Sequence, residues 1–115
     1  MYITNHNSIE IKVPLQSFVG KAETWVLVNS GATENFIDFH TIMKLQLRTR
    51  KLSNPRMVYN VDQSINQNGM ITHCCDLYVA KGNQKTWQQF YITNLGRNKL
   101  IFGYPWLKEF NPQIN

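Results

Sequence analysis

Two apolar stretches of this chain are separated by a short polar turn that carries the residues most able to do chemistry. The turn is Asn29-Ser30-Gly31-Ala32-Thr33, and apolar runs precede and follow it. Its side chains offer one amide and two hydroxyl groups, which can donate and accept hydrogen bonds. An amide takes up no proton at neutral pH and carries no negative charge. The turn as written therefore predicts no general base at Asn29.

The histidines and cysteines predict no second site. His6, His40 and His73 are scattered, and none forms a recognisable triad arrangement with a serine or cysteine. Cys74 and Cys75 are adjacent, so on a strand their side chains would point to opposite faces and bridge each other poorly. A zinc site needs about four converging ligands. We therefore expect no metal and no cofactor, and two free thiols typical of a reducing compartment.

The length and composition bound the class of protein. The 115 residues, of which 43% are apolar, predict one domain over residues 1–115 with a small core that needs no disulfide. No stretch reaches the roughly 20 apolar residues of a membrane-spanning helix. The N-terminus lacks the charged and then apolar pattern of a secretory signal. We therefore expect an intracellular, cytoplasmic protein without a membrane partner.

The charge is moderately basic and unevenly placed. The formal net charge is +5, and five of the 12 basic residues fall between positions 44 and 56, where no acid occurs. Such a stretch could attract phosphate or an acidic partner. Small domains commonly carry basic residues on a solvated surface, so a solvated segment is the favoured interpretation and nucleic acid is not the expected partner.

Apolar runs predict a mostly β chain of six to eight short strands. Strands are expected at 8–15, 23–28, 57–61, 70–80, 87–93 and 100–102, with hairpin turns at Gly20-Lys21 and Gly82-Asn83. Residues 46–56 are expected to form a connection, and residues 62–69 a polar turn.

Two short helices are also predicted. Apolar residues recur at helical spacing over 36–45, and Asp38 would favour the start of that helix through its negative charge. A second brief helix is expected over 106–110. The aromatic side chains expected to pack in the core are Trp25, Trp87 and Trp106.

Several segments of the chain resemble one protease family, in the same order along the sequence. With Asp read in place of Asn29, residues 24–38 resemble the active-site turn of a retropepsin, the half-sized aspartic protease of retroviruses and long-terminal-repeat retrotransposons. Other segments resemble the protease of gypsy-type retrotransposon Gag-Pol polyproteins, especially fungal ones: 58–62, 69–73, 90–96 and 100–107. The resemblance covers roughly residues 8–114. It implies an all-β fold, a closed β-barrel lobe with one or two short helices.

The resemblance implies a role for each residue of the turn. Asn29 stands at the position of the catalytic aspartate. Ser30 would grip the second copy of the turn across a dimer, and Gly31 would offer its carbonyl oxygen to a bound peptide. Ala32 and Thr33 complete the turn.

The resemblance also places two segments around that turn. The flap that covers the substrate falls at Asp62, Gln63, Ser64, Ile65 and Asn66. Ile65 is the flap side chain expected over the substrate. The segment that supports the turn from below is Ile101, Phe102 and Gly103.

A single lobe carries one such turn, so the resemblance implies a homodimer with its site on the two-fold axis. The implied partner is an extended peptide of a polyprotein substrate in a cytoplasmic retrotransposon particle. Both copies would carry Asn29, so we expect an aspartic endopeptidase that is inactive as written. A deliberate inactivating substitution and natural decay both remain open. The alternatives are a non-catalytic peptide-binding or dimerising module of the same fold and, less favoured, a basic nucleic-acid-binding β-domain.

Overall fold

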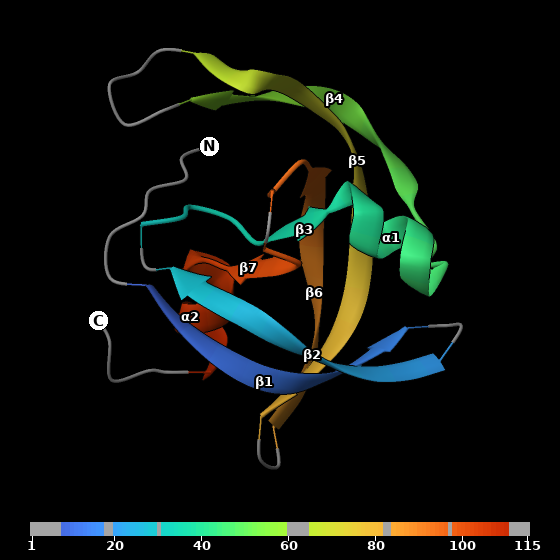
Figure 1. Cartoon of the computed structure of the whole chain (residues 1–115). Helices are drawn as coiled ribbons and strands as arrows, with labels where there is room; N and C mark the ends of the chain where they lie inside the picture. Colours follow the sequence, from blue (N-terminus) through green and yellow to red (C-terminus); the bar gives the residue numbers. More distant parts are fainter. Residues whose placement is uncertain are drawn as a thin grey trace.

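The computed structural model describes residues 8–17, 20–29, 31–59, 65–81, 84–96 and 98–110, and the structural statements concern these residues. The elements in chain order are β1 (Ser8–Ser17), β2 (Gly20–Asn29), β3 (Phe36–Asp38), α1 (Phe39–Leu45), β4 (Arg50–Tyr59), β5 (Ile65–Lys81), β6 (Gln84–Thr93), β7 (Leu100–Phe102) and α2 (Tyr104–Phe110) (Figure 1). None of the described helices is long and apolar enough to cross a membrane. The predicted mostly β chain with two short helices is confirmed.

All seven strands form one sheet in the order β1-β2-β7-β3-β6-β5-β4. Most pairs are antiparallel, whereas β2 with β7 and β3 with β6 are parallel. The expected closed barrel is wrong. Strand β1 meets β5 through only two residue pairs, Leu15 with Val79 and Gln16 with Tyr78. Among the described strands β4 pairs with β5 alone, so it ends the sheet as an edge strand.

The segment predicted as a helix over 36–45 divides into a strand and a helix. Its first three residues form β3, which lies between β6 and β7 and is completely covered. Pairing on both sides outweighs the helical spacing of the apolar residues there. The helix α1 begins at Phe39, because the Asp38 side chain accepts the backbone N–H of His40 at 2.9 Å and caps it. The expected role of Asp38 at the helix start is confirmed.

The connection predicted over 46–56 is wrong in its second half. Strand β4 already begins at Arg50, and its ladder with β5 changes register between Lys51 and Arg56. Pro55 lies in that interruption, where its missing N–H removes no ladder bond. The polar turn predicted to Gly69 is also shorter than expected, because β5 begins at Ile65.

The hairpin turn predicted at Gly20-Lys21 is wrong, and the one predicted at Gly82-Asn83 is not described. Gly20-Lys21 instead opens β2, and residues 18–19 before it are not described. Gly82-Asn83 lies outside the described ranges, although β5 and β6 pair up to Lys81 with Gln84 on either side of it.

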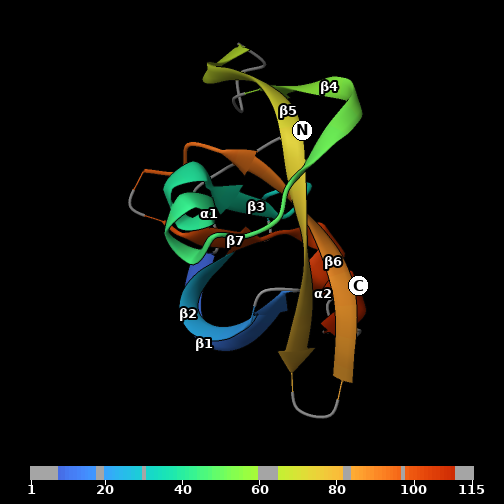
Figure 2. The same cartoon turned by 90° about the vertical axis from the view of Figure 1, so that its right-hand side faces the viewer.

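Strand β5 runs the height of the molecule, paired with β4 above and with β6 below (Figure 2). Two buried clusters form around it, and they divide its adjacent cysteines. Cys74 packs with Ala32 and Ile101, whereas Cys75 packs with Val26 and Phe102. Both thiols are free. The prediction that these two side chains point to opposite faces is confirmed.

The tryptophans differ from one another. Trp106 is buried and stacks on Phe102 with ring centroids 4.8 Å apart, as expected. Trp87 is 49% exposed and packs against Tyr78, so its predicted place in the core is wrong. The neighbouring Gln88 takes the buried position on that strand. The Trp25 side chain lies outside the described part of the structure.

Candidate functional site

The turn that follows β2 is built around a buried amide. Asn29 is the last residue of β2 and its side chain has no exposed surface. Its Oδ1 accepts the backbone N–H of Gly31 at 2.8 Å, and its carbonyl oxygen accepts the N–H of Ala32 at 3.0 Å. These two bonds close a tight turn and fix which way the side chain of Asn29 points.

The strands position Asn29 from both sides. It pairs with Ser8 of β1, and Val28 before it pairs with Phe102 of β7. A residue held between two partner strands has little freedom to move. The turn therefore projects from a fixed end of the sheet.

Gly103 lies directly against the turn. The residue after it, Tyr104, donates its N–H to the carbonyl oxygen of Ala32 at 2.9 Å. A Cβ on Gly103 would lie 2.6 Å from that oxygen and 2.9 Å from the carbonyl carbon of Glu34, and would overlap the Glu34 oxygen as well. Only glycine lets the backbone of β7 and α2 approach the turn this closely.

A buried network centred on Asn35 was not singled out by the sequence analysis. Asn35 Oδ1 accepts the N–H of Gly103 at 2.9 Å, and its Nδ2 donates to Gln88 Oε1 at 2.7 Å. Gln88 in turn donates to the carbonyl oxygen of Pro105 at 3.3 Å. The network joins the end of the turn to β6 and α2. The available signal was an asparagine directly before the apolar strand 36–38.

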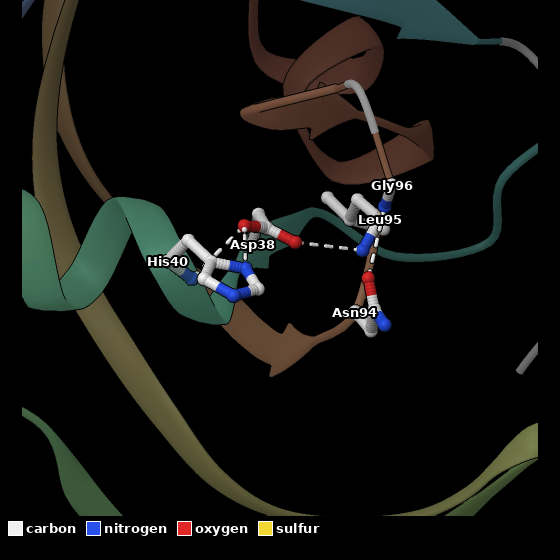
Figure 3. A network of polar contacts seen from close by, with 5 residues as sticks. All are labelled: Asp38, His40, Asn94, Leu95 and Gly96. Atoms are coloured by element: carbon white, nitrogen blue, oxygen red, sulfur yellow. Dashed lines mark hydrogen bonds and ion pairs between the residues drawn. The ribbon is translucent and has the colours of Figure 1, made fainter.

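A second network holds the loop after β6 (Figure 3). Asp38 Oδ1 accepts the N–H of Leu95 at 2.8 Å, while its Oδ2 accepts the N–H of His40 and lies 3.2 Å from His40 Nδ1. Asn94 Oδ1 accepts the N–H of Gly96 at 3.0 Å. This carboxylate is buried and committed to backbone donors, so it positions the loop and α1.

One carboxyl group stands next to the turn. Burial raises the pKa of Glu34, while the Arg56 guanidinium on β4 acts in the opposite direction. Burial also raises the pKa of Tyr91, while Arg56 lowers and Glu34 raises it. The hairpin formed by β4 and β5 arches over this side of the molecule (Figure 1). Glu34 and Arg56 therefore link the turn to that hairpin electrostatically.

The other predicted site residues are only partly described. Gly31 is half-buried and Thr33 is exposed on the turn, and Ile101 pairs with Leu27 beside it. Ile65 pairs with Tyr59 and Asn66 follows it in β5, but their side chains are not described. Ser30, Asp62, Gln63 and Ser64 lie outside the described ranges.

The arrangement can orient an amide but can transfer no proton through it. Within the described ranges, no three histidine, cysteine, aspartate or glutamate side chains gather where they could hold a metal ion. The buried donors and acceptors are instead used to hold the turn, and the side chain of Asn29 is itself buried within it.

No curated protein matches the chain. A family model described as the PEG10/RTL1 protease domain matches residues 25–115, which is well over half of the chain and includes the turn, the β4–β5 hairpin and α2. The chain therefore belongs to the PEG10/RTL1 protease-domain family, which is of the retropepsin-like aspartic protease kind.

Proposed function

We propose that this chain is one lobe of a homodimeric aspartic endopeptidase that processes a retrotransposon polyprotein. Asn29 stands where the catalytic aspartate belongs, so the lobe as written does not cleave. Membership of a protease-domain family supports the reaction class. The order of segments resembling gypsy-type elements, especially fungal ones, supports the polyprotein substrate and a cytoplasmic particle.

The buried Asn29 side chain at the end of β2 carries the proposal. Its Oδ1 accepts the Gly31 N–H at 2.8 Å inside a turn that Ala32 closes. Aspartate has nearly the same shape as asparagine, so a carboxylate at this position would accept the same N–H. That bond would be charge-assisted and would orient the carboxylate. The turn thus has a geometry that would orient a carboxylate, but the side chain at that position is the amide of Asn29.

The reaction requires two such turns. Aspartic proteolysis uses two facing carboxylates that share one proton, because both cannot ionise at short range. The ionised one takes a proton from the attacking water, and the protonated one donates a hydrogen bond to the developing oxyanion. One lobe supplies one turn, so the second comes from another copy across a two-fold axis. With Asn29 in both copies no proton acceptor is present.

The substrate is an extended peptide lying between the two turns and the β4–β5 hairpins. In this arrangement Gly31 offers its carbonyl oxygen to the peptide backbone and Ser30 grips the opposite turn. Main-chain hydrogen bonds bind such a peptide in the manner of an added strand. By the family resemblance, Ile65 is the hairpin side chain expected over the peptide.

Cleavage of a mixed peptide library by three purified chains tests the proposal. The Asn29→Asp variant should cleave at mildly acid pH, where one carboxyl of each pair is protonated. The unaltered chain and an Asn54→Asp variant should not; Asn54 is exposed on β4, so this control adds the same charge away from the turn. Equal rates from all three chains would contradict the proposal.

The second candidate is a peptide-binding or dimerising module with no cleavage to restore. The observation that favours it is the hydrogen bond from the Gly31 N–H to Asn29 Oδ1. Because the buried amide oxygen has a partner, the folded turn is stable without a carboxylate at position 29. In that case the Asn29→Asp variant would fold, bind a non-cleavable extended peptide as the unaltered chain does, and cleave nothing.

A further inference from the structure

A groove of about 830 Å³ lies between α1 and β5, apart from the Asn29 turn. Phe39, Ile42 and Met43 form its helical wall, and Met70, Thr72 and His73 form its strand wall. The remaining lining residues are Gln46, Leu47, Thr49, Ile92, Thr93 and Asn94. No residue of the turn lines it, so it is a separate feature of the molecule.

The walls of the groove expose large apolar side chains. Phe39 is 53% exposed, Met43 64% and Met70 57%. Three of the five exposed large hydrophobic residues of the described chain thus lie around one hollow. A gathered apolar patch of this kind marks a site of interaction, whereas single exposed apolar residues do not. Methionine side chains adapt to varied partners.

Two exposed basic residues, Arg48 and Lys51, neighbour lining residues of the groove. None of its lining residues is acidic. Lys51 of β4 pairs with His73, and cross-strand partners project to the same face, so the Lys51 side chain projects to the same face as that of His73. Arg48 stands between Leu47 and Thr49, which both line the groove.

Two aspartates near lining residues in the sequence, Asp38 and Asp76, bind other groups of the protein. Both oxygens of Asp38 accept backbone N–H groups, from His40 and Leu95. Asp76 pairs with Arg50 at 2.9 Å. The groove therefore combines apolar side chains in its walls with basic residues next to it.

We propose that this groove docks a short acidic amphipathic helix of a partner protein. The negative charge of such a helix complements the basic residues beside the groove. Its apolar side chains fill the space between Met43 and Met70. Helix α1 contributes the side chains of Phe39, Ile42 and Met43 to this wall, which suits the packing of an incoming helix. The site lies outside the proposed peptidase site and does not depend on it.

Fluorescence anisotropy with two labelled peptides tests the proposal. Both are about 12 residues long with leucine or phenylalanine at i, i+3, i+4 and i+7, and they carry either glutamate or lysine elsewhere. The acidic peptide should bind at least tenfold more tightly than the basic one. The double variant Met43→Ser, Met70→Ser should weaken the acidic peptide about tenfold or more, and Lys51→Glu about threefold.

Matched controls are available outside the groove. Trp87→Ser removes another half-exposed apolar side chain, and Lys85→Glu reverses another exposed charge of the sheet. Both should leave the affinity unchanged, and thermal unfolding should show that all variants fold. The proposal is overturned if the Met43/Met70 double variant binds as the unaltered chain does. Preference for the basic peptide, or tighter binding of a single-stranded oligonucleotide at the same residues, would overturn it too.

Discussion

Replacement of Gly103 by alanine should destabilise the protein by forcing the Asn29 turn away from β7. The added Cβ would lie 2.6 Å from the Ala32 carbonyl oxygen and 2.9 Å from the Glu34 carbonyl carbon. Both neighbours are backbone atoms that cannot rotate aside. Overpacking of this kind costs typically 1–3 kcal/mol and occasionally more. Since two backbone groups must move, we expect a loss of about 3 kcal/mol in the free energy of unfolding.

Gly69 provides a matched control for the same substitution. Its φ is +71°, but nothing lies within 4 Å of the position of a new Cβ. Gly69→Ala therefore adds strain without a collision. Positive φ costs an alanine about 1–2 kcal/mol, and the lower entropy of the unfolded chain offsets part of this. We expect a net loss of about 1 kcal/mol.

Thermal unfolding followed by circular dichroism separates the two variants. An unfolding entropy of about 2.1 cal/mol/K per residue gives roughly 0.24 kcal/mol/K for this chain of 115 residues. The melting temperature should then fall by about 12 °C for Gly103→Ala and about 4 °C for Gly69→Ala. A Gly103→Ala variant that melts no lower than Gly69→Ala would refute the close approach of β7 to the turn.

Three other predictions follow from buried or partly buried groups. Asn35→Leu should lower the free energy of unfolding in urea by about 3 kcal/mol, because the Gly103 N–H and the Gln88 amide lose partners; an unchanged midpoint would contradict the network. Burial raises the pKa of Cys75 to about 12, so its thiol should resist iodoacetamide at pH 8 in the native protein and react in urea; rapid native labelling of Cys75 would contradict this. Burial raises the pKa of Glu34, so the unfolded state loses this proton at a lower pH than the folded state, and stability falls as pH rises past the ordinary glutamate range. Glu34→Gln should therefore raise the melting temperature more at pH 7 than at pH 3. A larger gain at pH 3 would contradict the direction of this pKa shift.

Local sequence patterns predicted most strands and the second helix. Alternation over 8–15 and the run 100–102 are local signals, and both lie within strands. The boundary at Asp38 was harder, because β3 forms through its partners in β6 and β7 rather than through its own pattern. The same spacing that correctly predicted a helix could not tell which apolar residues it buries. Phe39 and Met43 belong to that pattern, yet both are exposed.

The sequence predicted the Asn29 turn of the candidate site but not the Asn35 network that holds this turn in place. The Asn29 turn is contiguous in sequence, so its polar residues between apolar runs are visible without a structure. The Asn35 network joins Gln88, 53 positions away, and only the fold brings these two amides together. The closed barrel failed for a similar reason, because closure depends on how far two distant strands pair. The register of β1 with β5 is a long-range property that local pattern does not specify.

The most direct test asks whether position 29 supplies half of a shared site. It measures the rate of peptide cleavage in mixtures of the Asn29→Asp variant with the unaltered chain. With full and random pairing, the rate from a fixed amount of variant should fall to about one half in an equal mixture and about one tenth with a ninefold excess of unaltered chain. This loss is expected because each mixed dimer holds only one carboxyl group at position 29, where cleavage needs two. A rate that stays constant as unaltered chain is added would contradict the shared site.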